Sequence, residues 1–366
     1  MSNTVTWFES YWAGIKNEMG GKAASLGEMT GAGLPVPPGF GINTTAYRKA
    51  ALAADLDQQI AHHLTGMDVN DTEDVSRRCA AIRDLIRTMP IPAEVEEAIR
   101  AGYLELSARA GVADVPVAVR SSATSEDSPD ASFAGEHDTY LWVRGGDDVI
   151  DAVRRCWASL FTDRATCYRV EMGYEHRLVE MSVVVQKMVR PKSAGVAFTL
   201  NPIDGDRSQI AIDSAWGFGE GVVSGEITPD NFLVDKVVRE IGRRVISVKE
   251  CEFALTDHDT VEKRDLEPER ASAPSLTDDE IRAIAALARK AEKHYGCPQD
   301  IEWAVDSDLP EGQNVILLQA RPETVWSKKA PAASPVAKSG DFMSSIVSTL
   351  MSPLYSRTSA DSTEIK

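Results

Sequence analysis

Residues 117–140 are the first candidate for a binding site. In this segment a short apolar strand leads into Arg120, small hydroxyl residues, acids and a glycine turn. This segment has too few apolar side chains to pack as core. Arg120 offers a planar, permanently charged donor for phosphate oxygens, and Gly135 would let backbone N–H groups approach an anion. The pattern favours phosphate binding. The alternative is an ordinary surface loop held by an arginine–carboxylate pair.

Two further polar segments, near residues 300 and 320, have the alternation of strands. The first places Asp300 and Glu302 on one strand face, because successive side chains of a strand point to opposite sides. The second places Gln319 and Arg321 on one face in the same way. If the two strands form a hairpin, Glu302 lies opposite Gln319, and the neighbouring pair is Asp300 with Arg321.

This predicted hairpin would gather the ligand types that magnesium prefers. Mg²⁺ takes oxygen ligands, usually one or two protein carboxylates together with substrate phosphates. Glu302 and Gln319 therefore fit as metal ligands, with Arg321 placed to meet phosphate charge. A salt-bridged hairpin with its polar face in water is the alternative.

Two glycine-rich segments are weaker signals for phosphate binding. The tripeptide Gly20-Gly21-Lys22 lacks the earlier glycine of a Walker A motif, because Lys16 stands in its place, although Lys22 could still reach a phosphate. Residues 217–225 lead into a strand rather than a helix, which argues against a dinucleotide site. They could form a mobile lid over phosphates or a plain flexible hairpin.

Gln186 interrupts an apolar run that predicts a buried strand over residues 181–189. An unpaired buried amide costs about 1–3 kcal/mol, so Gln186 needs a hydrogen-bond partner. An adenine edge bound alongside the strand would serve, and so would a protein backbone group.

These residues must be positioned by a chain of 366 residues, which is too long for one small core. Helical periodicity over 43–110 and 147–173 gives way to apolar strands from residue 181, and a capping box begins an amphipathic helix over 277–295. Helices around mixed, largely antiparallel sheets make the expected class α+β. We expect a domain over 1–326, with subdomains of roughly 1–180 and 181–326.

The C-terminal residues differ in composition from the rest of the chain. Residues 327–340 are rich in alanine, proline, serine and lysine and predict a flexible linker. Residues 341–366 contain one apolar stripe of a helix. That helix would either fold back onto its own domain or dock on another chain.

The charge and cysteine content exclude several classes of protein. A formal net charge of −17 argues against nucleic acid or an anionic membrane as partner, so a phosphate site must gather its basic residues locally and use a divalent cation. Five scattered cysteines without a C-x-x-C pair indicate a reduced chain with buried thiols. With no secretion signal and no membrane-length apolar run, the expected location is the cytoplasm.

The order of these motifs along the chain resembles one family. It is the N-terminal ATP-binding region of phosphoenolpyruvate synthases and pyruvate phosphate dikinases, and the resemblance covers about residues 10–326. The motifs that carry it are Gly21-Lys22-Ala23-Ala24-Ser25-Leu26-Gly27-Glu28, Val119-Arg120-Ser121-Ser122-Ala123-Thr124, Ser132-Phe133-Ala134-Gly135 with Thr139, the glycine-rich residues 217–225, Asp300-Ile301-Glu302-Trp303 and Gln319-Ala320-Arg321-Pro322. The resemblance implies an ATP-grasp-like fold of two to three subdomains around a nucleotide cleft.

The resemblance also implies roles for residues at the phosphate end of the nucleotide. The triphosphate would be held, and its transfer assisted, by Lys22, Arg120 and Arg321. The phosphate loop would be lined by Gly135 and Thr139. The task implied for this region as a whole is to neutralise and orient the polyphosphate so that a histidine can attack in line.

The remaining implied roles concern adenine and the metal. Gln186 would lie near adenine. Glu302 and Gln319 would bind Mg²⁺, or Mn²⁺ in its place, with Asp300 supporting them. ATP and a divalent cation are thus the implied cofactors.

Members of this family pass the β-phosphoryl group of ATP through a phosphohistidine, leaving AMP and phosphate. None of the six histidines here has the surroundings of a phosphohistidine motif. We therefore expect an AMP-forming, dikinase-type phosphotransferase subunit that acts in a hetero-oligomer with a phosphohistidine-bearing partner, unless the chain is a fragment. This split organisation resembles that of phenylphosphate synthases, with phenol as acceptor. The alternatives are the donor domain of a phosphoenolpyruvate synthase-like enzyme or an antibiotic phosphotransferase, and a non-catalytic nucleotide sensor.

Overall fold

The computed structural model describes residues 4–123, 139–175 and 179–326. The chain divides into two units after Glu323, and only residues 324–326 of the second unit are among those described. The predicted linker 327–340 and the predicted helix within 341–366 lie outside the described residues, as does Gly135. All elements described below belong to the first unit.

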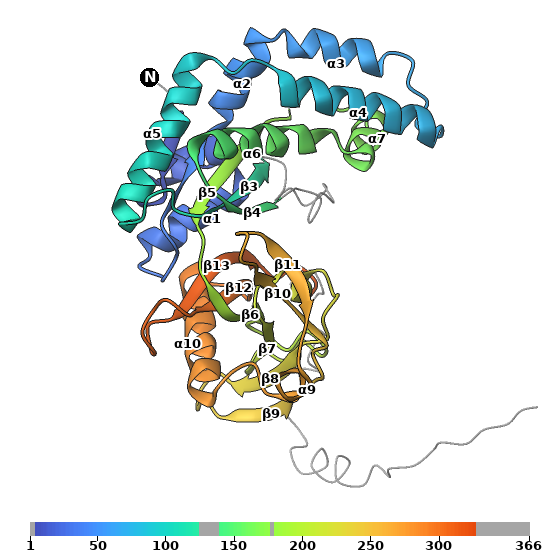
Figure 1. The fold of residues 1–366 in the computed structure, drawn as a ribbon. Helices are drawn as coiled ribbons and strands as arrows, with labels where there is room; N and C mark the ends of the chain where they lie inside the picture. The colour runs from blue at the N-terminus through green and yellow to red at the C-terminus, as the bar shows by residue number, and fades with distance from the viewer. Residues whose placement is uncertain (1–3, 124–138, 176–178, 327–366) are drawn as a thin grey trace, which may run out of the picture. The chain divides into compact units, whose positions relative to one another are not determined.

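The first sheet has five strands in the order β1-β2-β5-β3-β4. Three of them, β3, β4 and β5, are labelled in Figure 1. Each neighbouring pair is antiparallel. The strands are β1 Val5–Trp7, β2 Gly39–Ile42, β3 Val117–Ala123, β4 Thr139–Val143 and β5 Met181–Lys187. Because β5 lies in this sheet, the second sheet begins after Lys187, and the division into subdomains of roughly 1–180 and 181–326 stays a prediction.

Helices pack on the first sheet or on one another, and they bury several apolar positions of the predicted periodicity, although Leu104 is 64% exposed. They are α2 Thr44–Ala53, α3 Leu56–Leu64, α4 Thr72–Thr88, α5 Ala93–Ala110, α6 Gly146–Ala158 and α7 Asp163–Glu171. Ile82, Ile86 and Ile99 are buried in one core with strand residues such as Val183. The helical segment expected over 147–173 consists of α6 and α7, which are separated by the 3₁₀ turn η3 (Ser159–Phe161).

The second sheet has six antiparallel strands in the order β13-β12-β6-β7-β8-β9. They are β6 Pro191–Phe198, β7 Gln209–Trp216, β8 Asp230–Asp235, β9 Ile241–Val245, β12 Gln299–Asp306 and β13 Val315–Pro322. The helix α10 (Asp278–Tyr295) begins with the predicted capping box, in which Thr277 and Glu280 exchange hydrogen bonds. Its apolar face packs with Trp303 in a second core. The α+β class is thus confirmed.

Three smaller elements complete the second part of this unit. The strands β10 (Cys251–Leu255) and β11 (Val261–Asp265) form a hairpin, and α9 (Pro268–Ser272) follows it. The glycine-rich residues 217–225 contain the short helix α8 (Glu220–Val223). A plain hairpin is therefore the wrong interpretation of that segment, since its centre is helical.

The helix α1 (Lys16–Gly31) follows two 3₁₀ turns, η1 (Phe8–Ser10) and η2 (Ala13–Ile15). Its apolar residues Met19, Leu26 and Met29 are buried in the second core. At the same time α1 is hydrogen-bonded to β3 of the first sheet through Ser122. The helix is therefore a structural link between the two sheets.

The described part of the chain bears on the remaining expectations. All five cysteines are free thiols, three of them buried, and Cys167 and Cys297 are half-buried. None of the described helices is long and apolar enough to cross a membrane. Nor do the described residues contain a cluster of three or more histidine, cysteine or carboxylate side chains able to hold a metal by themselves.

Candidate functional site

The hairpin of β12 and β13 has the register that its alternation predicted. Glu302 is paired with Gln319, and Asp300 is paired with Arg321. A register shift between Glu302 and Trp303 follows directly after the first pair. The four polar side chains therefore lie on neighbouring positions of one hairpin, at the end of β12 where the strand begins.

Arg120 of β3 joins the first sheet to this hairpin. Its Nη2 donates to Oε1 of Gln319 at 2.7 Å and lies 3.3 Å from Oε2 of Glu302. Its Nη1 lies 3.5 Å from the carbonyl oxygen of Leu318. Because both side-chain oxygens approach one nitrogen, the amide and the carboxylate converge on one point.

The guanidinium of Arg120 also has one N–H group without an acceptor among the described residues. Within the part of the chain that the structure describes, its Nε is buried and has no hydrogen-bond partner. A buried donor without an acceptor costs about 1–3 kcal/mol, so an acceptor from outside the described residues would be favoured there. Phosphate oxygen is the acceptor that a guanidinium fork matches best.

The second pair, Asp300 and Arg321, is an ion pair with one buried and one exposed member. Nε and Nη2 of Arg321 donate to Oδ2 of Asp300 at 2.7 and 2.6 Å. Burial raises the pKa of Asp300, and the charge of Arg321 opposes that rise without cancelling it. The side chain of Arg321 is 57% exposed. Asp300 thus orients the exposed side chain of Arg321. This contact agrees with the supporting role implied for Asp300.

Lys22 lies on α1, two residues after a kink at Gly20. Gly20 has φ +70°, and a Cβ there would lie 2.1 Å from the carbonyl oxygen of Ser122. Oγ of Ser122 accepts from the backbone N–H of Ala23 at 3.1 Å and donates to the carbonyl of Met19 at 3.1 Å. The Gly-Gly-Lys segment is therefore shaped by contact with β3, and Lys22 is half-buried beside it.

This arrangement gives Ser122, one of the small hydroxyl residues after Arg120, a structural role in place of a phosphate donor's. Ser122 is fully buried, and both of its hydrogen-bonding capacities are used by α1. The composition of the segment could not distinguish a hydroxyl that binds a ligand from one that holds a helix.

We expect the substitution Gly20→Ala to destabilise the protein by about 1–3 kcal/mol, because alanine is strained at positive φ and its Cβ would collide with β3. Urea unfolding measures the change. Gly31→Ala is the matched control in the same helix, since its Cβ would meet nothing within 4 Å. Equal stability of the two variants would contradict the argument.

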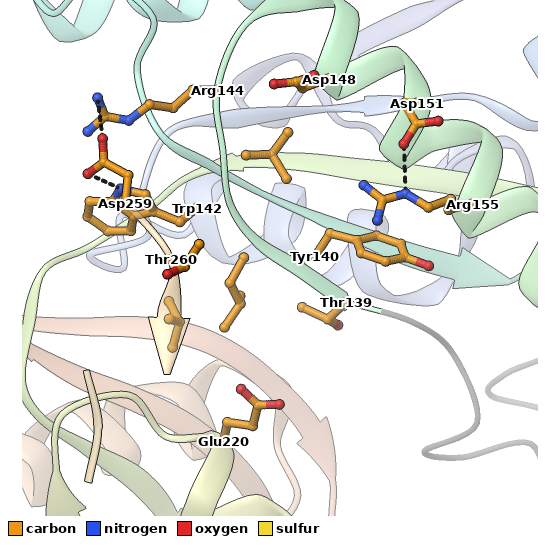
Figure 2. Close-up of a pocket in the computed structure, with 13 residues that line it drawn as sticks. Thr139, Tyr140, Trp142, Arg144, Asp148, Asp151, Arg155, Glu220, Asp259 and Thr260 are labelled. Atoms are coloured by element: carbon orange, nitrogen blue, oxygen red, sulfur yellow. Dashed lines mark hydrogen bonds and ion pairs between the residues drawn. The ribbon is translucent and has the colours of Figure 1, made fainter. Parts of the chain in front are cut away.

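Thr139 is paired with Arg120 in the first sheet, and its side chain lines a pocket of about 530 Å³ (Figure 2). In this pocket the indole Nε1 of Trp142 donates to Asp259 at 3.2 Å, and Arg144 pairs with the same carboxylate at 3.2 Å. The pocket thus extends from β4 to the β10–β11 hairpin. The structure brings Thr139 next to Arg120 by strand pairing, and its implied role in a phosphate loop stays a prediction.

Gln186 has a protein partner, which is the second of the two alternatives. Its Nε2 donates to the carbonyl of Pro37 at 3.3 Å, and the residue is buried. It lies between Gly39 of β2 and Ala118 of β3 in the sheet. A contact of Gln186 with adenine stays a prediction.

One residue of α1 that the sequence did not single out contacts the site directly. Oγ of Ser25 donates to the carbonyl of Ala320 at 3.0 Å. Ala320 stands between Gln319 and Arg321 in β13. The signal was present in the sequence, because Ser25 follows Lys22 by three residues and so shares its helix face.

Comparison with known proteins identifies the family. Residues 16–340 match the family described as pyruvate phosphate dikinase, AMP/ATP-binding domain. A phosphoenolpyruvate synthase of Pyrococcus furiosus is 42% identical over 90% of this chain, which covers 44% of that protein. Two proteins named probable phosphoenolpyruvate synthase, from Staphylothermus marinus and Methanothermobacter thermautotrophicus, are each 44% identical over 88% of the chain, with 41% and 46% of their own lengths covered.

The chain therefore spans under half the length of these relatives. A solved structure of D-alanyl-alanine synthetase A from Vibrio cholerae shares 9% identity over 68% of this chain and 62% of its own, with a TM-score of 0.19, which is too low to support an argument. The family match covers most of the chain and includes both polar segments of the Arg120 site. The chain belongs to the family of the AMP/ATP-binding domain of pyruvate phosphate dikinase.

Proposed function

We propose that this chain is the ATP-binding, phosphoryl-donor part of a dikinase-type phosphotransferase, with an ATP-grasp-like arrangement of its two sheets around the nucleotide. The observation that supports it most directly is the contact of Arg120 with both Glu302 and Gln319. This contact joins a cationic group of one sheet to two oxygen ligands of the other. The family's binding of AMP or ATP agrees with such a site.

Magnesium fits the donor set of this site. Oxygens of Glu302 and Gln319 approach the same nitrogen of Arg120, so two oxygen ligands already lie together. Two protein ligands suffice for Mg²⁺ only when phosphates and water complete its coordination, which is its usual mode with nucleotides. Glu302 and Gln319 would hold the ion, and when bound it would neutralise phosphate charge.

The chain's own cationic residues would then orient the polyphosphate. Arg120 would donate from Nε, Arg321 from its exposed guanidinium, and Lys22 from α1. A histidine nitrogen would attack the β-phosphorus, the bond from that phosphorus to the oxygen of AMP would break, and AMP would leave a pyrophosphorylated histidine. Water would then attack the γ-phosphorus, and the bond from that phosphorus to the β–γ bridging oxygen would break, which gives phosphate and phosphohistidine. Almost all catalysis of such a step is positioning and charge stabilisation.

The histidine would come from a phosphohistidine-bearing partner, in a hetero-oligomer or in a longer protein. The relatives reported above carry the name of phosphoenolpyruvate synthases, which makes pyruvate the first acceptor to test. Phenol, the acceptor favoured by the sequence alone, has no support in these findings and stays a prediction. A nucleotide sensor without chemistry is distinguished from both by the experiment below.

The test is transfer of label from β-³²P-ATP with Mg²⁺ to the histidine-bearing half of a phosphoenolpyruvate synthase supplied as a separate protein. We expect acid-labile label on that partner's histidine and formation of AMP. Arg321→Ala should reduce the rate about 100-fold with the fold intact, because it removes a cation aimed at the developing charge. The control is Arg77→Ala, which removes an exposed arginine of α4. MgATP binding without any label on an intact partner would support the sensor instead.

A further inference from the structure

We propose that Ser25 is a positioning residue of this site: its hydroxyl fixes the helix carrying Lys22 to the strand carrying Gln319 and Arg321. The inference rests on the proposed function, because it concerns how the phosphate-binding groups are held at constant separation. In this inference Ser25 contacts no phosphate itself, and it acts by positioning the residues that would bind the nucleotide.

The first observation is the contact of Ser25 with β13. Its Oγ donates to the carbonyl of Ala320 at 3.0 Å and lies 3.3 Å from the hydroxyl of Tyr295 on α10. Ala320 is the residue between the two polar members of β13. A shift of α1 along β13 would therefore break this bond.

The second observation is the opposite attachment of the same helix. Nearer the start of the same helix, Oγ of Ser122 on β3 accepts from the N–H of Ala23 and donates to the carbonyl of Met19. Ser122 follows Arg120 by two residues, so it lies on the same strand face as Arg120. The segment between Ala23 and Ser25 is thus attached at one end to the strand of Arg120 and at the other end to the strand of Gln319.

A third contact continues this attachment along the helix. Oε1 of Glu28 lies 3.2 Å from Nε2 of His294 on α10. Ser25 is a helix neighbour of Lys22 on one side and of Glu28 on the other, because each pair is three residues apart. The side of α1 next to Lys22 is therefore bound to β13 through Ser25, and the next position along the helix is bound to α10.

These contacts give the helix the role of a spacer. The groups of the proposed site come from three separate elements. Lys22 lies on α1, Arg120 lies on β3, and Gln319 and Arg321 lie on β13. Phosphate oxygens must meet Lys22, Arg120 and Arg321 at hydrogen-bond distance, and misplacement by about 1 Å can cost about 100-fold in rate. A hydroxyl bonded to a strand carbonyl beside both polar residues is placed to prevent that misplacement.

The experiment compares binding of MgATP with binding of adenosine by calorimetry, using the full chain. The ratio of the two dissociation constants isolates the contribution of the phosphate groups to binding. A loss of folding stability would not change this ratio. We expect Ser25→Ala to weaken MgATP binding about fivefold to tenfold and to leave adenosine binding within about twofold, since one hydrogen bond is lost. Its melting temperature should change little.

Two further variants separate positioning from a general effect of lost hydroxyls. Thr30→Val removes a hydroxyl that donates within α1, to the carbonyl of Leu26 at 2.8 Å, and should leave both affinities unchanged. Tyr295→Phe keeps the Ser25–Ala320 bond and should also leave the ratio unchanged. A loss in Tyr295→Phe as large as that in Ser25→Ala would overturn the assignment to the Ala320 contact.

The outcomes distinguish this inference from the proposed function. If the wild-type chain binds MgATP and Ser25→Ala keeps the wild-type ratio of affinities, Ser25 has no positioning role and the proposed function stands. If the wild-type chain binds no MgATP at all, the proposed function fails and the role of Ser25 fails with it.

Discussion

Replacing Arg120 with alanine should lower the rate of AMP formation with a histidine-bearing partner by about 100-fold to 1000-fold, the range for loss of one preorganised donor to a developing negative charge. The structure makes this residue the most consequential of the site, because it contacts both Glu302 and Gln319. Its removal would take away a phosphate donor and also the group that holds the two oxygen ligands together. MgATP affinity should fall in parallel.

Two other variants test whether the geometry of Arg120 matters as well as its charge. Arg120→Lys keeps one positive charge but cannot donate in the planar, forked arrangement, so it should recover only a small part of the activity. Arg154→Ala removes a partly buried arginine that pairs with Glu96 at 3.1 Å, and it should leave AMP formation unchanged. Full activity of Arg120→Ala would refute the placement of the polyphosphate at this residue.

The hairpin that carries the oxygen ligands was predictable from sequence, and the reason is local. Strand alternation has a period of two, so a single turn position fixes both pairs at once. Glu302 accordingly lies opposite Gln319, and Asp300 lies opposite Arg321. The capping box of α10 was predictable for the same reason, since both of its residues lie within one turn.

The contacts between distant segments were not predictable by these means. Arg120 and Gln319 are 199 residues apart, and nothing local to either specifies the other. Ser122 has the composition of a ligand-binding hydroxyl, yet α1 uses its donor and its acceptor. Gln186 required some partner on energetic grounds, but only the arrangement of β2 beside β5 identifies it as the carbonyl of Pro37.

The largest effect on stability is expected at a buried ion pair of the second sheet. Asp230 of β8 and Lys249 both have fully buried side chains, and Nζ of Lys249 lies 2.6 Å from Oδ1 of Asp230. The carboxylate also accepts from the N–H of Ser247 at 3.0 Å. The N–H and hydroxyl of Ser275 donate to Oδ2 at 2.8 and 2.7 Å. Asp230 thus holds three separate chain segments together.

Asp230→Ala should destabilise the protein by about 3–5 kcal/mol, because it leaves the Lys249 ammonium buried without its counter-charge. Lys249→Met should cost less, since Asp230 keeps three donors from Ser247 and Ser275. The double variant should be more stable than Asp230→Ala alone, because it removes the uncompensated ammonium. Urea unfolding of the three variants measures this cycle, and Lys49→Met, at an exposed pair with Glu94, is the control with little expected change. If the two single changes in the free energy of unfolding add up to that of the double variant, the two charges are not coupled. The ion pair would then not be what attaches β8 to the segments around Ser247 and Ser275.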